Sequence, residues 1–188
     1  MKGRLFVLSS PSGGGKSTVI RKLRKMDGDL CYSISATTRP PRAGEKEGLD
    51  YFFLAEKIFR RKMKEGAFVE WAKVHGFYYG TLRDQIERYF ETGKNILLDI
   101  DVRGGLNLKK NYPESVLIFL LPPSIKVLED RLRKRGTEKN GTLKKRLTTA
   151  RKEIEIADQY DFQVVNDKLD DTVKEVRAII QKYEKSEL

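Results

Sequence analysis

The sequence has little of the features that mark secreted, metal-clustered or membrane-spanning proteins. Its 188 residues include one cysteine, Cys31, and one histidine, His75. A single cysteine cannot form an internal disulfide, and one Cys with one His has no recognisable metal-ligand spacing, so we expect both to be structural. The longest apolar run, 116–121, is far too short to cross a bilayer, and the N-terminus lacks the apolar core of a signal peptide. We therefore expect a cytoplasmic protein with no membrane partner.

Aromatic residues are absent from the most basic stretch of the chain. Residues 126–152 contain eleven Lys or Arg and three Asp or Glu, in a chain of formal net charge +11. Such charge suits nucleic acid, an anionic membrane or small polyanionic substrates. Nucleic-acid platforms usually interleave aromatic residues for base stacking, so we expect no nucleic-acid partner except as a sideline of this basic stretch. The high charged content with few Cys and Met is also compatible with growth at high temperature.

The length suits one domain, and its pattern predicts an α/β fold. Strands alternate with helices, which predicts a mostly parallel central sheet flanked by helices. The short strands after an exposed loop at 39–48 predict a small antiparallel insert. The predicted strands are 4–9, 30–38, 51–54, 68–74, 77–79, 95–101, 115–121 and 162–165, and the predicted helices are 16–26, 56–65, 82–92, 103–110, 124–135, 142–158 and 169–183.

A glycine-rich stretch, Ser-Pro-Ser-Gly-Gly-Gly-Lys-Ser at 10–17, lies between the first predicted strand and helix. Glycines let main-chain N–H groups approach a polyphosphate, Lys16 adds a positive charge, and the following helix directs its N-terminus at the same phosphates. Ser17 offers a hydroxyl to Mg²⁺. The motif GxxxxGK[ST] has glycine where this chain has Ser10, so a chance glycine-rich turn is the alternative. The flanking strand and helix favour a P-loop.

Two further groups of residues suit phosphate chemistry. Asp99 ends an apolar strand, where an acidic residue of a P-loop protein holds Mg²⁺ directly or through water; an ordinary strand-end aspartate is the alternative. Arg39 and Arg42 flank two prolines that stiffen their loop, so both guanidiniums could hold one anion, with Tyr51 and Tyr79 adding hydroxyl donors. A solvated surface turn with packed tyrosines explains the same residues.

The basic stretch suggests a movable lid. Arg131 and Arg135 lie one helical turn apart, and Arg146 follows in the next predicted helix. Phosphoryl transfer depends on positioning and on neutralising charge, which arginines supply. A solvated basic face is the alternative.

The chain resembles the guanylate kinase family over nearly its whole length. The resemblance rests on ordered segments rather than on one motif. These are 10–17, Ser-Ala-Thr-Thr-Arg-Pro-Pro-Arg-Ala-Gly-Glu (35–45), Gly-Leu-Asp-Tyr (48–51), Phe-Val-Glu-Trp (68–71), Tyr-Tyr-Gly-Thr (78–81), Leu-Asp-Ile-Asp (98–101), Arg-Leu-Arg-Lys-Arg-Gly-Thr-Glu (131–138), Lys-Arg-Leu-Thr-Thr-Ala (145–150) and Val-Asn-Asp (165–167).

The resemblance implies a P-loop kinase that converts ATP and GMP to ADP and GDP with Mg²⁺, also with dGMP as acceptor, and so contributes to GTP supply in purine metabolism. It implies a single domain, 1–188, with a core (1–33, 88–123 and 159–188), a mixed α+β GMP-binding insert (34–87) and a helical lid (124–158). Monomer and homo-oligomer both stay open.

The family's site residues are expected at the matching positions. Catalytic roles fall to Lys16, Arg131, Arg135 and Arg146; ATP binding to Ser12, Gly13, Gly14, Gly15, Lys16, Ser17, Thr18 and Asn166; metal binding to Ser17 and Asp99. The GMP phosphate is assigned to Arg39, Arg42, Tyr51 and Tyr79, and guanine to Ser35, Glu70, Thr81 and Asp101.

The chemistry of guanine supports the assignment of Glu70. Guanine presents adjacent N1–H and N2–H donors that suit a two-oxygen carboxylate, whereas adenine has an acceptor at N1. We expect direct in-line transfer, because no side chain has to act as a nucleophile.

Two departures from the family pattern and two rival functions remain. Ser10 stands where the family has a small Gly or Ala, and Arg103 stands where Gln often occurs; neither removes a catalytic group. One rival is an inactive interaction module that binds phosphorylated peptides in the GMP pocket, but such modules typically lose the phosphate loop. The other is a kinase with a different base preference, against which Ser35, Glu70 and Asp101 argue.

Overall fold

A computed structural model describes residues 3–26, 30–74, 76–134 and 140–185. The chain divides into two compact units. The first comprises Met1–Val7 and Gly28–Val116, and the second comprises Leu8–Asp27 and Leu117–Leu188. Among the described residues, no helix is long and apolar enough to cross a membrane.

The central sheet has five strands in the order β2-β7-β1-β8-β9. The pairs β2–β7 and β8–β9 are both parallel, which confirms the predicted α/β class. All residues of β1 are buried, as the apolar run predicts. The bounds are β1 Leu5–Ser9, β2 Cys31–Ser33, β7 Ile96–Asp99, β8 Val116–Leu121 and β9 Phe162–Val165.

The first unit also contains a four-stranded sheet in the order β4-β3-β6-β5. The predicted strand 30–38 is wrong, because the strand is interrupted at 34–35 and the segment forms two strands that belong to different sheets. The antiparallel prediction is also partly wrong, since β3 and β4 are parallel while β3–β6 and β5–β6 are antiparallel. The bounds are β3 Ala36–Thr37, β4 Phe52–Phe53, β5 Phe68–Val74 and β6 Phe77–Leu82.

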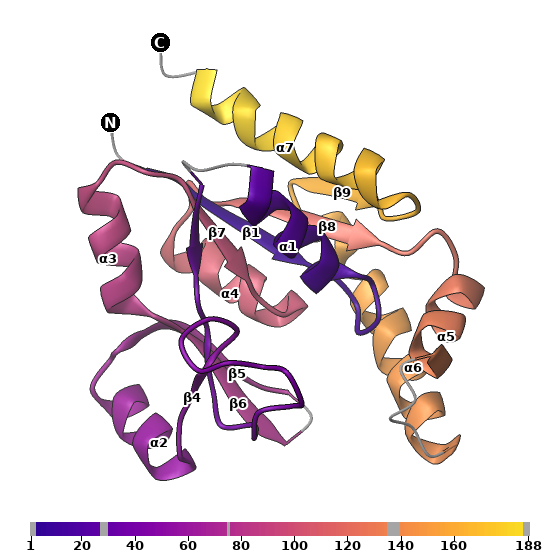
Figure 1. Cartoon of the computed structure of the whole chain (residues 1–188), viewed down its shortest axis with the longest axis horizontal. Helices are drawn as coiled ribbons and strands as arrows, with labels where there is room; N and C mark the ends of the chain where they lie inside the picture. Colours follow the sequence, from indigo (N-terminus) through magenta and orange to yellow (C-terminus); the bar gives the residue numbers. More distant parts are fainter. Residues whose placement is uncertain (1–2, 27–29, 75, 135–139, 186–188) are drawn as a thin grey trace. The chain divides into compact units, whose positions relative to one another are not determined.

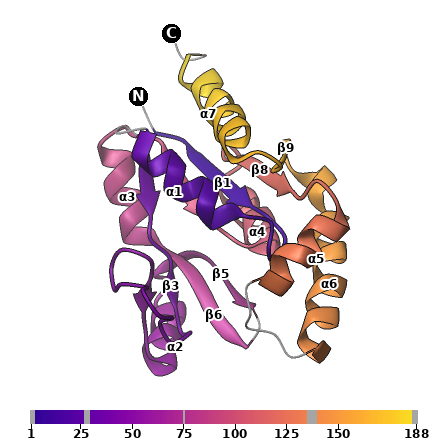
Figure 2. The same cartoon turned by 45° about the vertical axis from the view of Figure 1, so that its right-hand side comes forward.

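Three helices complete the first unit. Helix α2 (Glu56–Lys64) packs Phe59 against Phe68 and Tyr78 of the four-stranded sheet, and Figure 2 shows this helix beside β3, β5 and β6. Helix α3 (Arg83–Glu91) follows β6, and α4 (Val102–Asn111) follows β7. The strand predicted at 95–101 ends at Asp99 instead, because Asp101 caps the N-terminus of α4.

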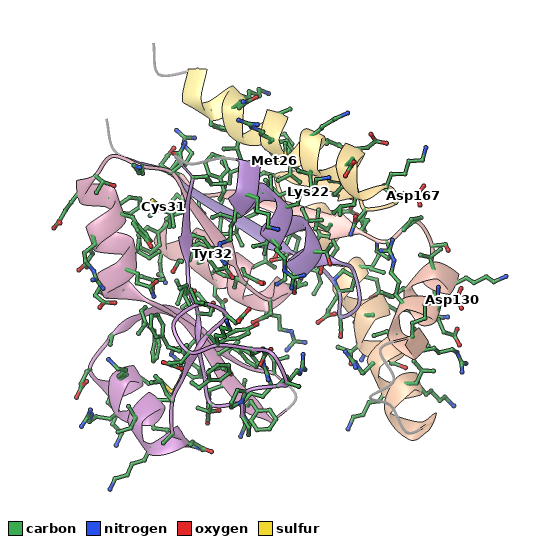
Figure 3. The ribbon with its side chains drawn as sticks, in the orientation of Figure 1. Lys22, Met26, Cys31, Tyr32, Asp130 and Asp167 are labelled. Atoms are coloured by element: carbon green, nitrogen blue, oxygen red, sulfur yellow. The ribbon has the colours of Figure 1, made fainter. Side chains whose placement is uncertain are left out.

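The second unit contains the other helices. Helix α7 (Leu169–Lys185) runs alongside α1 (Lys16–Met26) in Figure 1. Lys22 of α1, labelled in Figure 3, pairs with Asp170 of α7. Helix α5 (Ile125–Lys134) packs against α6 (Asn140–Ile154) through Leu128, Leu132 and other apolar side chains. The helix predicted at 142–158 corresponds to α6, which ends at Ile154. A short 3-10 helix at Ala157–Gln159 follows it.

Candidate active site

The glycine-rich loop of the second unit follows buried β1 and opens α1, which is the context that the phosphate-loop motif requires. Gly13 and Gly15 have φ values of 91° and 93°, which only glycine adopts without strain. The loop is closed by hydrogen bonds from Gly14 N to Pro11 O (2.8 Å) and from Thr18 N to Gly15 O (3.0 Å). The sequence therefore forms a compact turn at the N-terminus of a helix, where main-chain N–H groups attract anions.

Side chains from the C-terminal part of the second unit hold this loop from outside. Asn166 Nδ2 donates to Gly14 O at 2.7 Å, and Thr172 Oγ1 donates to Asn166 Oδ1 at 3.2 Å. Arg131 donates to Asn166 O at 2.9 Å and to Gly14 O at 3.5 Å. A Cβ at Gly15 would lie 2.3 Å from Asn166 Nδ2, so the loop and Asn166 are closely fitted. These bonds fix the orientation of the Gly14 peptide group.

Helix α6 contacts the loop at Ser12. Arg146 Nη2 donates to Ser12 Oγ at 2.5 Å, and Ser12 N donates to Glu153 Oε2 at 3.4 Å. Two of the three predicted lid arginines, Arg131 and Arg146, are thus brought to the same loop. The third, Arg135, lies outside the described residues, as does His75.

The departure at Ser10 is accommodated within the loop. Ser10 Oγ donates to Pro11 O at 3.1 Å. A Cβ built on Gly14 would lie 2.7 Å from Ser10 Cβ, so the serine occupies the space beside this glycine. Gly14 therefore has to lack a side chain because Ser10 and the carbonyl oxygen of Pro11, 3.0 Å from the same position, occupy the space, and not because of a positive φ.

The residues expected to hold phosphate and Mg²⁺ start α1. Lys16 is half-buried, whereas Ser17 and Thr18 are exposed in the first helical turn. Asp99, the other expected metal residue, is half-buried at the end of β7 in the first unit. Hydroxyl and carboxylate oxygens are ligands that Mg²⁺ accepts.

The first unit brings together the residues expected to bind guanine. Thr81 Oγ1 donates to Glu70 Oε1 at 2.7 Å, and the two residues are 1% and 8% exposed. A Cβ at Gly104 would lie 2.8 Å from Glu70 Oε2 and 3.2 Å from Asp101 Oδ2, so both carboxylates border this glycine. Ser35 is buried, with its Oγ 3.5 Å from Asp99 O.

Asp101 has a structural task as well. Its Oδ1 accepts hydrogen bonds from Arg103 N (3.0 Å) and Gly104 N (3.1 Å) and so caps α4. The cap fixes the direction of the carboxylate, and Oδ2 is the oxygen that lies toward Gly104. The side chain of Arg103, the other departure, is exposed.

Residues expected to bind the acceptor phosphate also gather in the first unit. The Arg39 guanidinium lies 5.4 Å from the centre of the Tyr51 ring, and the rings of Tyr51 and Tyr79 are 6.0 Å apart. Arg39 is only 9% exposed, so the prediction of an exposed loop at 39–48 is wrong at this residue. Burial, followed by the Asp99 charge, raises the pKa of Tyr51, so its phenol remains a hydrogen-bond donor at neutral pH.

Glu45 organises the arginine loop, a role that the sequence did not reveal. Its Oε1 accepts from Arg39 Nη2 at 2.8 Å and its Oε2 accepts from Arg42 N at 2.7 Å. Burial is the largest single influence and opposes the charge of both Glu45 and Arg39, but their mutual hydrogen bond, the other hydrogen bonds to each group and the nearby opposite charges together outweigh it. The pKa of Glu45 therefore lies below its ordinary value and that of Arg39 above it. Arg42 takes part in these contacts through its main-chain N–H, and its side chain is exposed.

The sequence did not reveal three residues that support the site: Glu45 beside Arg39, Glu153 beside Ser12, and Thr172 beside Asn166. Glu45 lies in the quoted segment 35–45, three residues after Arg42 and six after Arg39, so its closeness to two arginines in the sequence was a usable signal. Glu153 and Thr172 are distant in sequence from the loop that they support, and no local pattern points to them.

Comparisons with known proteins agree with this geometry. The guanylate kinase family profile matches residues 2–183. The chain is 45% identical to the guanylate kinase of Thermotoga maritima over 96% of this chain and 87% of that protein. It is 46% identical to the guanylate kinase of Caldanaerobacter subterraneus over 95% and 87%.

Solved structures give the same result at the level of fold. The guanylate kinase of Anaplasma phagocytophilum matches with a TM-score of 0.83 and 34% identity, covering 98% of this chain and 87% of that one. The shikimate kinase of Bacteroides thetaiotaomicron matches with a TM-score of 0.51 and 14% identity over 95% and 98%, a likeness of fold alone. The chain therefore belongs to the guanylate kinase family of P-loop nucleoside monophosphate kinases.

Proposed function

We propose that the chain transfers the γ-phosphoryl group of ATP to GMP, giving ADP and GDP. The observation that carries the choice of acceptor is the buried Glu70 carboxylate, whose Oε1 accepts from Thr81 while Oε2 lies beside Gly104. The N1–H and N2–H groups of guanine supply two donors to such a carboxylate, whereas the N1 acceptor of adenine would face it unfavourably.

We assign the donor nucleotide to the second unit. The amides at the start of α1 and Lys16 bind the phosphates of ATP, and Asn166 maintains the loop conformation through Gly14 O. Arg131 and Arg146 stabilise the charge of the transferring group, because their contacts already hold them at this loop. A guanidinium has five N–H donors, and the two described contacts of Arg131 use only part of them.

We assign the acceptor phosphate to Arg39, Arg42, Tyr51 and Tyr79. Arg39 is fixed by Glu45 before any ligand arrives, so little side-chain freedom is lost on binding. Tyr51 and Tyr79 supply hydroxyl donors beside that guanidinium. The remaining guanine contacts are assigned to Ser35, Thr81 and Asp101.

Mg²⁺ is part of the proposal. When bound, it neutralises charge on the β- and γ-phosphates. Among the described residues, no group of three or more His, Cys, Asp or Glu forms a protein-only metal site. The Ser17 hydroxyl and the Asp99 carboxylate suit an ion whose other ligands are phosphate and water oxygens.

Two finer points follow from the same assignments. None of the assigned acceptor contacts is to the ribose 2′-hydroxyl, so we propose that dGMP is also used. GDP is one phosphoryl transfer from GTP, so the proposed metabolic role is GTP supply. A cytoplasmic location remains a prediction.

The test is a substrate panel. Purified protein, Mg²⁺ and ATP are mixed separately with GMP, dGMP, AMP, CMP and UMP, and ADP formation is followed. We expect turnover with GMP and dGMP alone, and its loss in Lys16→Ala. Turnover with another base would overturn the acceptor assignment. Absence of turnover with every acceptor would favour the interaction module, which phosphopeptide binding would then test.

A further inference from the structure

Within the part of the chain that the structure describes, the outer edge of β2 has no neighbouring strand in the sheet. The strand order places β2 at an end, with β7 on its inner side. Cys31 N donates to Asn95 O at 2.9 Å on that inner side. Because alternate residues of a strand direct their main-chain groups to opposite sides, Tyr32 and Ile34 face the outer edge. Buried main-chain groups at such an edge need partners from elsewhere.

Helix α3 supplies those partners through two side chains on one face. Ile34 N donates to Gln85 Oε1 at 3.1 Å, and Gln85 Nε2 donates to Ile34 O at 2.8 Å. One turn later, the Tyr89 hydroxyl donates to the carbonyl of Tyr32, the β2 residue labelled in Figure 3, at 3.4 Å. Gln85 is 8% exposed. The side-chain amide of Gln85 makes the pair of bonds that a neighbouring strand would make. The N–H and C=O of Ile34 determine which end of this amide is the oxygen and which the nitrogen.

The position of this contact gives it a consequence for ligand binding. Ile34 lies where the chain leaves β2 of the five-stranded sheet for β3 of the four-stranded sheet, and Gln85 lies just after β6, where the chain returns. The next residue, Ser35, accepts from Phe52 N at 2.9 Å through its carbonyl. Ser35 is also one of the residues assigned to guanine. The amide of Gln85 therefore restrains the main chain that carries this side chain.

We propose that Gln85 is a positioning residue for the acceptor base. Its amide bonds to the N–H and C=O of Ile34, a contact that we call the clamp, and thereby fixes Ser35 for contact with guanine. This inference rests on the proposed GMP kinase function. Gln85 acts through Ser35 and does not touch the nucleotide. Loss of the clamp weakens acceptor binding and leaves donor binding unchanged.

The test compares Gln85→Met, Ser35→Ala, the double variant and Tyr89→Phe in the full chain. Methionine has a similar length but neither donates nor accepts the two bonds. We expect Gln85→Met to raise KM for GMP about tenfold, while KM for ATP and kcat at saturating GMP stay within about twofold. Tyr89→Phe is the matched control, since it removes the other edge contact of the same helix, and it should leave KM for GMP within about twofold.

The double variant shows whether Gln85 acts through Ser35. If it does, adding Ser35→Ala to Gln85→Met raises KM for GMP by less than Ser35→Ala raises it in wild-type protein. Additive effects, an equal rise in KM for both nucleotides, or an unchanged KM for GMP would overturn the proposal. If Gln85→Met does not fold, Gln85→Glu, which keeps the acceptor for Ile34 N–H and loses the donor, is measured with the same expected split.

Hydrogen exchange separates this inference from the proposed function. The Ile34 amide should exchange about tenfold faster in Gln85→Met than in wild-type protein, whether or not GMP is the substrate. An unchanged exchange rate would refute the clamp itself. Absence of GMP turnover in wild-type protein would instead refute the proposed function.

Discussion

Replacing Glu70 by glutamine tests the acceptor assignment with little change in shape. The side chain is buried, and Thr81 Oγ1 donates to its Oε1 at 2.7 Å, a bond that the glutamine carbonyl can accept equally well. The other oxygen, beside Gly104, becomes an NH₂ group. That group would face the N–H donors of guanine, so the variant replaces an acceptor by a donor and removes the negative charge.

The expected loss follows from the number of hydrogen bonds affected. A hydrogen bond to a charged group contributes about 1.5 to 3 kcal/mol, and guanine makes two such bonds to a carboxylate. The glutamine carbonyl can still accept one of them as a neutral bond of about 0.5 to 1.5 kcal/mol, so the net loss is about 2.5 to 4.5 kcal/mol, or about 10²- to 10³-fold in kcat/KM for GMP. The folded state itself should not weaken, because a buried charge is removed and the Thr81 bond is kept.

The assay is steady-state kinetics with varied GMP at saturating ATP, accompanied by urea denaturation. Glu87→Gln, which changes an exposed glutamate on α3, is the control and should match wild-type protein. A fall in kcat/KM of less than about tenfold would refute the role of Glu70 as the guanine acceptor. A large loss of folding stability would show that the carboxylate is needed for the fold instead.

Three further changes test the contacts around the site. Asn166→Ala should lower the free energy of unfolding by about 1 to 3 kcal/mol and raise KM for ATP, because Gly14 O loses its 2.7 Å bond; unchanged urea denaturation and ATP kinetics would contradict this. Glu45→Gln should destabilise the protein at neutral pH, and its difference from wild type should shrink as the pH falls below the ordinary glutamate pKa of about 4.3. The pKa of Glu45 is lowered in the folded state, so its bond to Arg39 stabilises only while the carboxylate is ionised; a pH-independent difference in urea denaturation would refute this. Lys22→Ala should change stability by no more than about 0.5 kcal/mol by the same method, because both partners of its ion pair are largely exposed (37% and 69%), and a larger loss would be inconsistent with a surface pair.

Local patterns were sufficient for most elements and for the phosphate loop. The continuous apolar run at β1 requires only a strand buried on both faces, and the spacing of Val19, Ile20 and Leu23 in α1 requires only helical burial. Both elements form where predicted, to within one residue. The glycines of the loop were identified for the same reason, since a turn before a helix needs residues that accept positive φ. These features depend on neighbours in sequence.

The prediction of one strand at 30–38 failed because this stretch, in which apolar and polar residues alternate without a break, contributes one strand to each of two sheets. Alternation shows that a segment is extended, but it does not show which strand pairs with it. At the interruption, Ile34 bonds to Gln85, about fifty residues away in sequence, so no local signal marks it. The parallel pairing of β3 with β4 was missed on the same grounds.

The sequence by itself determined the α/β class and the phosphate loop, because these follow from local periodicity and backbone freedom, while its resemblance to the guanylate kinase family supplied the residues expected to bind guanine. Only the tertiary structure decided which groups hold those residues in place. Asn166 on Gly14, Arg146 on Ser12 and Thr81 on Glu70 are contacts between side chains and partners that the linear pattern leaves unspecified. A buried polar group must find a hydrogen-bond partner, but folding selects that partner by proximity in space and not along the chain.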